Sequence, residues 1–138
     1  GGDSVMAVWN VPVASEGHAL LATRAMFSAQ QAMKDLQERE MALPRMEFGI
    51  GINTGRAVAG NMGSEARREY SVVGDAVNTA ARLAGLTPGG KVWIGADTLA
   101  QVKDCITARP LEPLSLKGKK ELVQAYEVVA ISHERNRL

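Results

Sequence analysis

Three polar residues between positions 75 and 82 have the spacing that places side chains on one face of a helix. Asp75, Asn78 and Arg82 are separated by three and four residues, which matches the helical period. Such a face would present an amide and a guanidinium to one ligand, and a planar, permanently charged guanidinium suits phosphate oxygens. The same spacing also permits a solvated face on which Asp75 pairs with Arg82, and spacing alone leaves both interpretations open.

Two further segments carry charges that could act on a bound ion. Asp3 lies in a glycine-flanked turn before the apolar run 5–9, where a carboxylate could reach a divalent cation, although aspartate is also common in turns for geometric reasons. The segment 117–120, Lys-Gly-Lys-Lys, could clamp a phosphate or could simply be a basic turn between two strands. Neither this segment nor 89–91 has the spacing of a P-loop.

The composition supports one domain and removes several classes of function. The 138 residues are 46% hydrophobic, which is enough for a single core. Sixteen Lys and Arg against fifteen Asp and Glu give a net charge of +1, so the chain has no overall positive field to hold nucleic acid or an anionic membrane. One cysteine and two histidines exclude an internal disulfide framework, a thiolate zinc site and a three-histidine site.

Apolar periodicity predicts an α+β domain. Helices are expected over 16–41, 76–86 and 96–102, and strands over 5–9, 47–54, 57–62, 70–73, 91–95, 107–116 and 122–130. We expect 57–62 to return antiparallel to 47–54 after a tight turn, and the last two strands to pair around 117–120. The helices would cover one face of a sheet. No apolar run approaches the length of a membrane span, and we expect a cytoplasmic domain, alone or as the cytosolic part of a longer protein.

The segment 47–54 alternates strictly between two kinds of residue. Phe48, Ile50 and Ile52 lie on one face of the predicted strand, while Gly49 and Gly51 lie on the other. The apolar face is expected to pack in the core. The glycine face allows another group to approach the backbone closely.

Three segments together resemble the class III nucleotidyl cyclase catalytic domain. They are 48–55 (FGIGINTG), 60–63 (GNMG) and 70–83 (YSVVGDAVNTAARL). The segments 2–7 (GDSVMA) and 116–119 (LKGK) are similar to the family's Gly-Asp hairpin and to its last basic turn. The resemblance implies a ferredoxin-like α+β domain over residues 1–131, with a mixed or antiparallel sheet and covering helices, followed by a polar tail over 132–138.

The same resemblance implies an adenylate cyclase, which converts ATP to 3′,5′-cyclic AMP and pyrophosphate. In this family two subunits pair head to tail as a homodimer and share active sites, each with two Mg²⁺ or Mn²⁺ ions. The resemblance implies that Asp3 binds these metals and that Asn78 orients the ribose. It also implies that Arg82 stabilises charge at the α-phosphate and that Lys117 holds the triphosphate.

Ser71 occupies the position where many family members have a base-reading aspartate. A serine or threonine there is similar to a branch of adenylate cyclases, and a hydroxyl can accept a hydrogen bond from the adenine amino group. Ser71 therefore favours ATP over GTP as the substrate.

The family's first metal aspartate and its purine-reading lysine precede the Gly-Asp hairpin, and neither lies in these 138 residues. We therefore expect a domain that lacks the family's first strand and helices, and little or no cyclase activity from these residues alone. The alternative is a degenerate cyclase-like module that regulates or dimerises without catalysis. Asp3, Asn78, Arg82 and Lys117 favour the enzyme, because a degenerate domain need not retain all four.

Overall fold

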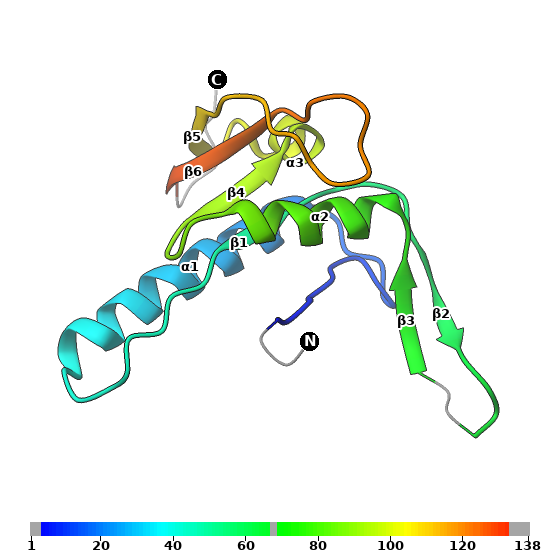
Figure 1. Cartoon of the computed structure of the whole chain (residues 1–138), viewed down its shortest axis with the longest axis horizontal. Helices are drawn as coiled ribbons and strands as arrows, with labels where there is room; N and C mark the ends of the chain where they lie inside the picture. Colours follow the sequence, from blue (N-terminus) through cyan, green and yellow to red (C-terminus); the bar gives the residue numbers. More distant parts are fainter. Residues whose placement is uncertain (1–3, 67–68, 133–138) are drawn as a thin grey trace.

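The computed structural model describes residues 4–66 and 69–132, and Figure 1 shows two sheets with helices packed around the larger one. In chain order the elements are α1 (His18–Arg39), β1 (Ile50–Ile52), β2 (Val58–Met62), β3 (Glu69–Val73), α2 (Asp75–Leu86), β4 (Val92–Gly95), α3 (Ala96–Val102), β5 (Ile106–Pro110) and β6 (Ala125–Ile131). The α+β prediction is confirmed. None of the helices in the described ranges is both long enough and apolar enough to cross a membrane.

The larger sheet has four strands in the order β1-β4-β6-β5. β1 runs parallel to β4, whereas β6 runs antiparallel to both β4 and β5. The predicted pairing of the last two strands is confirmed, although each strand is shorter than expected. Between them, residues 111–124 form a long connection in which an isolated bridge joins Leu114 to Val123.

One face of this sheet packs on α1. Ala19 and Ala22 of α1 lie in a buried cluster with Ile94 and Val128, among other apolar residues of the sheet. The buried Gln30 donates hydrogen bonds to the carbonyl oxygens of Phe48 (2.8 Å) and Lys91 (2.9 Å). These bonds fix α1 to the segments that lead into β1 and β4.

The opposite face of β1 packs on α2, so the expectation that the helices cover a single face is wrong. A Cβ added at Gly51 would lie 2.5 Å from the backbone nitrogen of Ala84, and one at Gly49 would collide with the carbonyl oxygen of Thr87. The glycine face of β1 is therefore where the backbone of α2 comes close, as the alternation predicted. Ile52 points the other way, into the α1 cluster.

The predicted strand over 5–9 is absent. Residues 4–15 form an irregular segment with no sheet partner among the described residues, and Val5 is 98% exposed. The chain bends at Asn10, which has a φ of 74° and whose side chain accepts a hydrogen bond from the backbone nitrogen of Ser15. Apolar residues form a strand only when a neighbouring strand takes up their backbone hydrogen bonds.

The partner predicted for 57–62 is also wrong. β2 pairs antiparallel with β3, from Val58 opposite Val73 to Met62 opposite Glu69, and the two strands form a separate ribbon. The segment between β1 and β2 does not turn back on itself, because the Asn53 side chain donates to the carbonyl oxygen of Ala76 (3.1 Å) and ties the segment to α2. Figure 1 shows the ribbon extending away from the larger sheet.

Candidate functional site

The first turn of α2 is held from two sides. Gly74 precedes the helix, and its carbonyl oxygen accepts hydrogen bonds from the backbone nitrogens of Val77 and Asn78, both at 3.1 Å. The Asn53 amide binds the carbonyl oxygen of Ala76. Leu83 is almost fully buried on the inner side of the helix. Asn78 is therefore carried on a fixed helix, and its side chain is exposed.

The segment 116–119 is a tight turn in the connection between β5 and β6. The backbone nitrogen of Lys119 donates to the carbonyl oxygen of Leu116 (3.0 Å) and closes the turn. Leu116 is buried and anchors it. Gly118 has a φ of 84°, in the left-handed region that glycine adopts without steric cost. Lys117 is an exposed residue of this turn.

The turn 116–119 lies directly on the polar face of α2. Lys119 Nζ forms an ion pair with Asp75 Oδ2 at the start of the helix. Further along the helix, the Arg82 guanidinium lies against Gly118, where an added Cβ would be 2.8 Å from Arg82 Nη1. The structure thus brings Arg82 beside the turn that carries Lys117. Asp75 pairs with Lys119, so the alternative in which Asp75 pairs with Arg82 is wrong.

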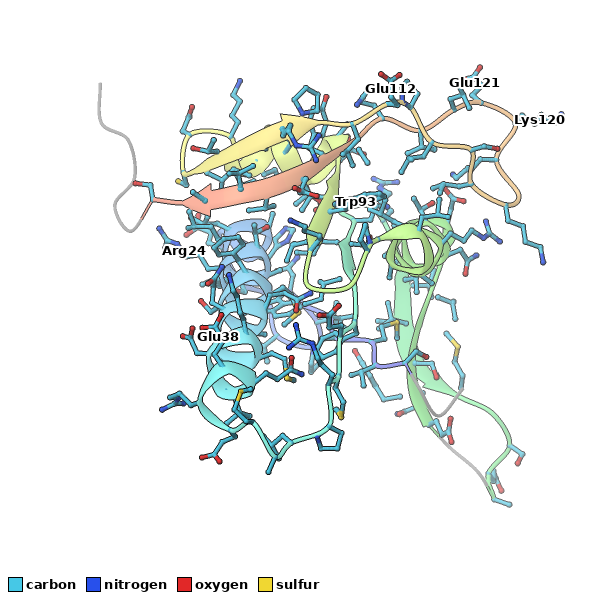
Figure 2. The ribbon with its side chains drawn as sticks, turned by 60° about the vertical axis from the view of Figure 1, so that its left-hand side comes forward. Arg24, Glu38, Trp93, Glu112, Lys120 and Glu121 are labelled. Atoms are coloured by element: carbon cyan, nitrogen blue, oxygen red, sulfur yellow. The ribbon has the colours of Figure 1, made fainter. Side chains whose placement is uncertain are left out.

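Figure 1 shows the long β5–β6 connection passing over the start of α2. In Figure 2, Lys120 and Glu121 lie at the outer edge of this connection, and Trp93 lies between the larger sheet and α2. The basic turn therefore has an inner side, where Lys119 meets the helix, and an outer side that faces solvent.

Ser71 is half-buried in the middle of β3, and its partner in β2 is Gly60. A Cβ added at Gly60 would meet nothing within 4 Å, so the space beside Ser71 is open. Side chains alternate along a strand, which places Ser71 on the same face of the ribbon as Val58 and Val73. None of the contacts found within the described residues joins Ser71 to Arg82 or to the turn 116–119.

Asp3, the predicted metal ligand, lies outside the described residues. Within 4–66 and 69–132, no group of three or more His, Cys, Asp or Glu side chains is placed to hold a metal ion. The part of the site that the structure describes is therefore the cationic part, made of Arg82 and the basic turn.

A hollow of about 360 Å³ lies elsewhere, on the side of the molecule formed by the second half of α1. It includes neither α2 nor the turn 116–119. Its charged lining residues are Lys34, Lys91 and Arg45 together with Glu38, Glu47 and Glu127. Because equal numbers of positive and negative charges line the hollow, it has no electrostatic preference for a phosphate, and we place the candidate site on α2.

Glu127 of β6 is the centre of an ion cluster that the sequence did not indicate. Its carboxylate accepts a hydrogen bond from Trp93 Nε1 (3.1 Å) and lies 3.3 Å from Arg109 Nη2 and 4.0 Å from Lys91 Nζ. Burial acts to raise the pKa of Glu127, but the bonds from Trp93 and Arg109 and the charges of Lys91 and Arg109 outweigh burial and leave this pKa below its ordinary value. The cluster joins β4, β6 and β5 on the face of the sheet that also carries α2.

Comparison with known proteins assigns the chain and its fold to one family. The family model described as the adenylate and guanylate cyclase catalytic domain matches residues 1–129. The chain belongs to this family. Curated relatives include adenylate cyclase 1 of Rhizobium meliloti, 37% identical over 94% of this chain, and the adenylate cyclase of Anabaena cylindrica, 32% identical over 94%. The chain spans only 20% and 27% of the length of these two proteins.

Solved structures agree with this assignment. The adenylyl cyclase CyaB from P. aeruginosa has a TM-score of 0.80 at 28% identity, covering 91% of this chain and 67% of that one. The guanylyl cyclase Cya2 has a TM-score of 0.81 at 32% identity, covering 89% and 64%. The architecture described above is therefore that of a cyclase catalytic domain, and similar folds occur in cyclases named for either purine.

Two residues of this cyclase domain acquire a place in the site only from the structure. The sequence drew attention to Asp75 for its helical spacing and to Lys119 as part of a basic segment, but their ion pair joins positions 44 residues apart. Opposite charge in the two segments was the one available signal, and it did not specify which lysine meets which carboxylate.

Proposed function

We propose that this cyclase domain is the catalytic domain of an adenylate cyclase that converts ATP to 3′,5′-cyclic AMP and pyrophosphate. The observation that carries the proposal is the contact between the Arg82 guanidinium and Gly118, because it joins the polar face of α2 to the turn that bears Lys117. The permanently charged guanidinium of Arg82 and the ammonium group of Lys117 suit the negative charges of a triphosphate. The cyclase relatives supply the reaction class.

In the proposed reaction the ribose 3′-oxygen attacks the α-phosphorus. The new O–P bond closes the ring, the bond from the α-phosphorus to the β-phosphate oxygen breaks, and pyrophosphate leaves with that electron pair while the hydroxyl proton passes to solvent. The enzyme's task in such a transfer is mainly positioning and electrostatic stabilisation. Asn78 orients the ribose, Lys117 holds the triphosphate, and Arg82 stabilises the charge that develops at the α-phosphate.

Divalent cations remain part of the proposal through Asp3 and the family alone. Bound Mg²⁺ or Mn²⁺ supplies Lewis acidity and neutralises phosphate charge. We propose Asp3 as one of the ligands, and no step above depends on its position.

ATP is the proposed substrate because of Ser71. Cyclases named for adenine and for guanine both resemble this domain, so the general fold does not decide between the purines. The Ser71 side chain, beside the open space at Gly60, can accept a hydrogen bond from an adenine amino group.

We also propose a cytoplasmic location, which is a prediction from the sequence.

A head-to-tail homodimer is the proposed assembly, with α2 and the turn 116–119 of one subunit completing a site with residues of the other. The β2–β3 ribbon supports an interface, because the paired residues Val58 and Val73 are 65% and 46% exposed. Large apolar side chains that lie side by side on a surface mark interaction sites. The ribbon supplies such a pair next to Ser71.

The proposal is tested by Arg82→Ala in the full-length protein, with cyclic AMP formation measured from MgATP and MnATP. Loss of a charge-stabilising donor lowers kcat by about 100-fold or more. Arg39→Ala is the matched control, since Arg39 is exposed in the last turn of α1 and is expected to leave the rate unchanged. Equal rates for the wild type and the Arg82 variant would remove Arg82 from the mechanism. Similar losses in both variants would point to damage to the fold instead.

A further inference from the structure

The turn 116–119 needs a support that the sheet does not provide. It lies in the connection 111–124, where the Leu114–Val123 bridge is the one strand-like pairing found in the described structure. Beyond that bridge, buried Leu116 anchors the start of the turn and the Lys119–Leu116 hydrogen bond closes it. Neither of these contacts determines how the turn is oriented on α2.

We propose that Asp75 is a positioning residue of the nucleotide site: its ion pair with Lys119 holds the turn 116–119 on α2 and so sets where Lys117 stands relative to Arg82. This inference rests on the proposed function, because the ion pair is proposed to serve nucleotide binding. Asp75 itself touches Lys119 and is not placed against the substrate.

The exposure of the two partners supports a positioning role. The Lys119 side chain is 28% exposed and the Asp75 side chain is 73% exposed, whereas Lys117 and Lys120 on either side of Lys119 are exposed residues. Of the three lysines in the segment 117–120, Lys119 is therefore the one that is directed onto the helix. An exposed ion pair adds little to global stability, so its removal is expected to free the turn without unfolding the domain.

The two contacts of the turn with α2 are separated along the helix. Asp75 lies in the first turn of α2 and holds Lys119, while Arg82 lies about two helical turns further on and contacts Gly118. Together with the buried Leu116, these two separated contacts restrict the orientation of the turn, whereas one contact would allow it to pivot. Lys117 lies between the buried Leu116 and the contacting residue Gly118, so the position of its backbone follows from theirs.

The test compares Asp75→Asn and Lys119→Met in the full-length protein with Asp97→Asn and Lys103→Met. Asp97 lies in the first turn of α3, and Lys103 is the residue at its C-terminal cap. The control variants therefore remove the same charges from another helix, including the favourable interaction of a carboxylate with a helix N-terminus. Both control positions are exposed.

Loss of the ion pair is expected to act on KM. Lys117 is proposed to hold the triphosphate before and during the reaction, and an interaction of equal strength in both states changes KM while kcat is preserved. We expect Asp75→Asn and Lys119→Met each to raise KM for ATP about five-fold, with kcat within about two-fold of the wild type, as for a misplaced binding group. The control variants are expected to match the wild type. KM values for Asp75→Asn and Asp97→Asn that agree would overturn the inference.

A second comparison shows whether Asp75 acts through Lys117. In a Lys117→Ala background the ion pair has no triphosphate-binding group to position, so adding Asp75→Asn is expected to change KM by less than about two-fold. A further rise equal to that in the wild-type background would mean that Asp75 acts by another route, and the inference would be wrong.

Hydrogen exchange separates this inference from the proposed function. The backbone nitrogen of Lys119 donates to Leu116 within the turn, so loosening the turn is expected to speed exchange of this amide in Asp75→Asn but not in Asp97→Asn. If the protein makes no cyclic AMP, the proposed function fails, and faster exchange would still support the contact as the support of the turn. Unchanged exchange together with unchanged KM would overturn the inference while the proposed function stands.

Discussion

The Arg82 guanidinium lies so close to Gly118 that a Cβ at position 118 would stand 2.8 Å from Nη1 and 3.2 Å from Cζ. The Arg82 guanidinium therefore occupies the space that a side chain at position 118 would need. This contact links a helix and a turn that are far apart in the sequence, and it places the Arg82 guanidinium beside the turn that carries Lys117.

Gly118→Ala is expected to reduce cyclase activity by more than its effect on stability explains. The new methyl group displaces Arg82, and kcat/KM is expected to fall about tenfold or more. Gly90→Ala is the matched control, because Gly90 has the same φ of 84° and open space around it. Both variants carry the same backbone strain, about 1 kcal/mol of unfolding free energy. Thermal unfolding and kinetics measured side by side check the prediction, and equal activities would contradict it.

Glu127→Gln is expected to destabilise the domain at neutral pH by about 1–2 kcal/mol, the cost of weakening charged hydrogen bonds to Arg109 and Trp93. Glu112→Gln, at an exposed position of the β5–β6 connection, is the control. Chemical unfolding at pH 7 measures both variants. A Glu127 variant as stable as its control would mean that the cluster does not contribute to folding.

The same cluster predicts a pH dependence of stability. The pKa of Glu127 is lower in the folded protein than its ordinary value, so its contribution is fully present above the ordinary pKa of a glutamate, about 4.3. This contribution is lost as the pH falls through the depressed folded pKa. The difference in unfolding free energy between wild type and Glu127→Gln should therefore be constant from pH 7 to about 5 and should shrink below about pH 4. A difference that grows on acidification would contradict the sign.

Val58→Asp is expected to weaken the proposed dimer. Val58 is 65% exposed opposite Val73 on the β2–β3 ribbon, and a carboxylate buried in an interface without a partner raises the dissociation constant by about tenfold or more. Val13→Asp, at a position that is 77% exposed outside the ribbon, is the control. Sedimentation of the full-length protein measures both dissociation constants. Equal dissociation constants for Val58→Asp and Val13→Asp would mean that the dimer interface lies elsewhere.

Ser71→Ala is expected to reduce the preference for ATP. Loss of an acceptor for the adenine amino group lowers kcat/KM for ATP about tenfold, with a smaller effect on GTP. Ser28→Ala, on an exposed part of α1, is the control. Competition between the two nucleotides measures the ratio directly, and an unchanged ratio would remove Ser71 from purine selection.

Local patterns explain why much of the fold was predictable. The helical period between Asp75 and Arg82 is a property of neighbouring residues, and α2 (Asp75–Leu86) agrees closely with the helix predicted over 76–86. Gly49 and Gly51 predicted a close approach to the backbone, and α2 and the residue after it occupy that space. The polar face of α2 and the basic turn were therefore visible in the sequence, although the contact between them was not.

Contacts between distant segments explain what the sequence could not predict. The apolar run 5–9 and the segment 57–62 both have strand-like composition, but pairing depends on which backbone edges come together in space. β2 pairs with β3, and residues 4–15 have no strand partner in the described structure. The pairing of Asp75 with Lys119 likewise depends on the path of residues 111–124, which lie outside the strands of the larger sheet although part of this segment was predicted as strand.

The most direct test of the account is the product that the full-length protein forms from ATP. The products formed from MgATP or MnATP are separated and identified by mass. The account predicts 3′,5′-cyclic AMP and pyrophosphate in equal amounts, and it predicts that Arg82→Ala abolishes or strongly reduces the formation of both. ADP and phosphate as products, or no product from ATP with either metal, would contradict it.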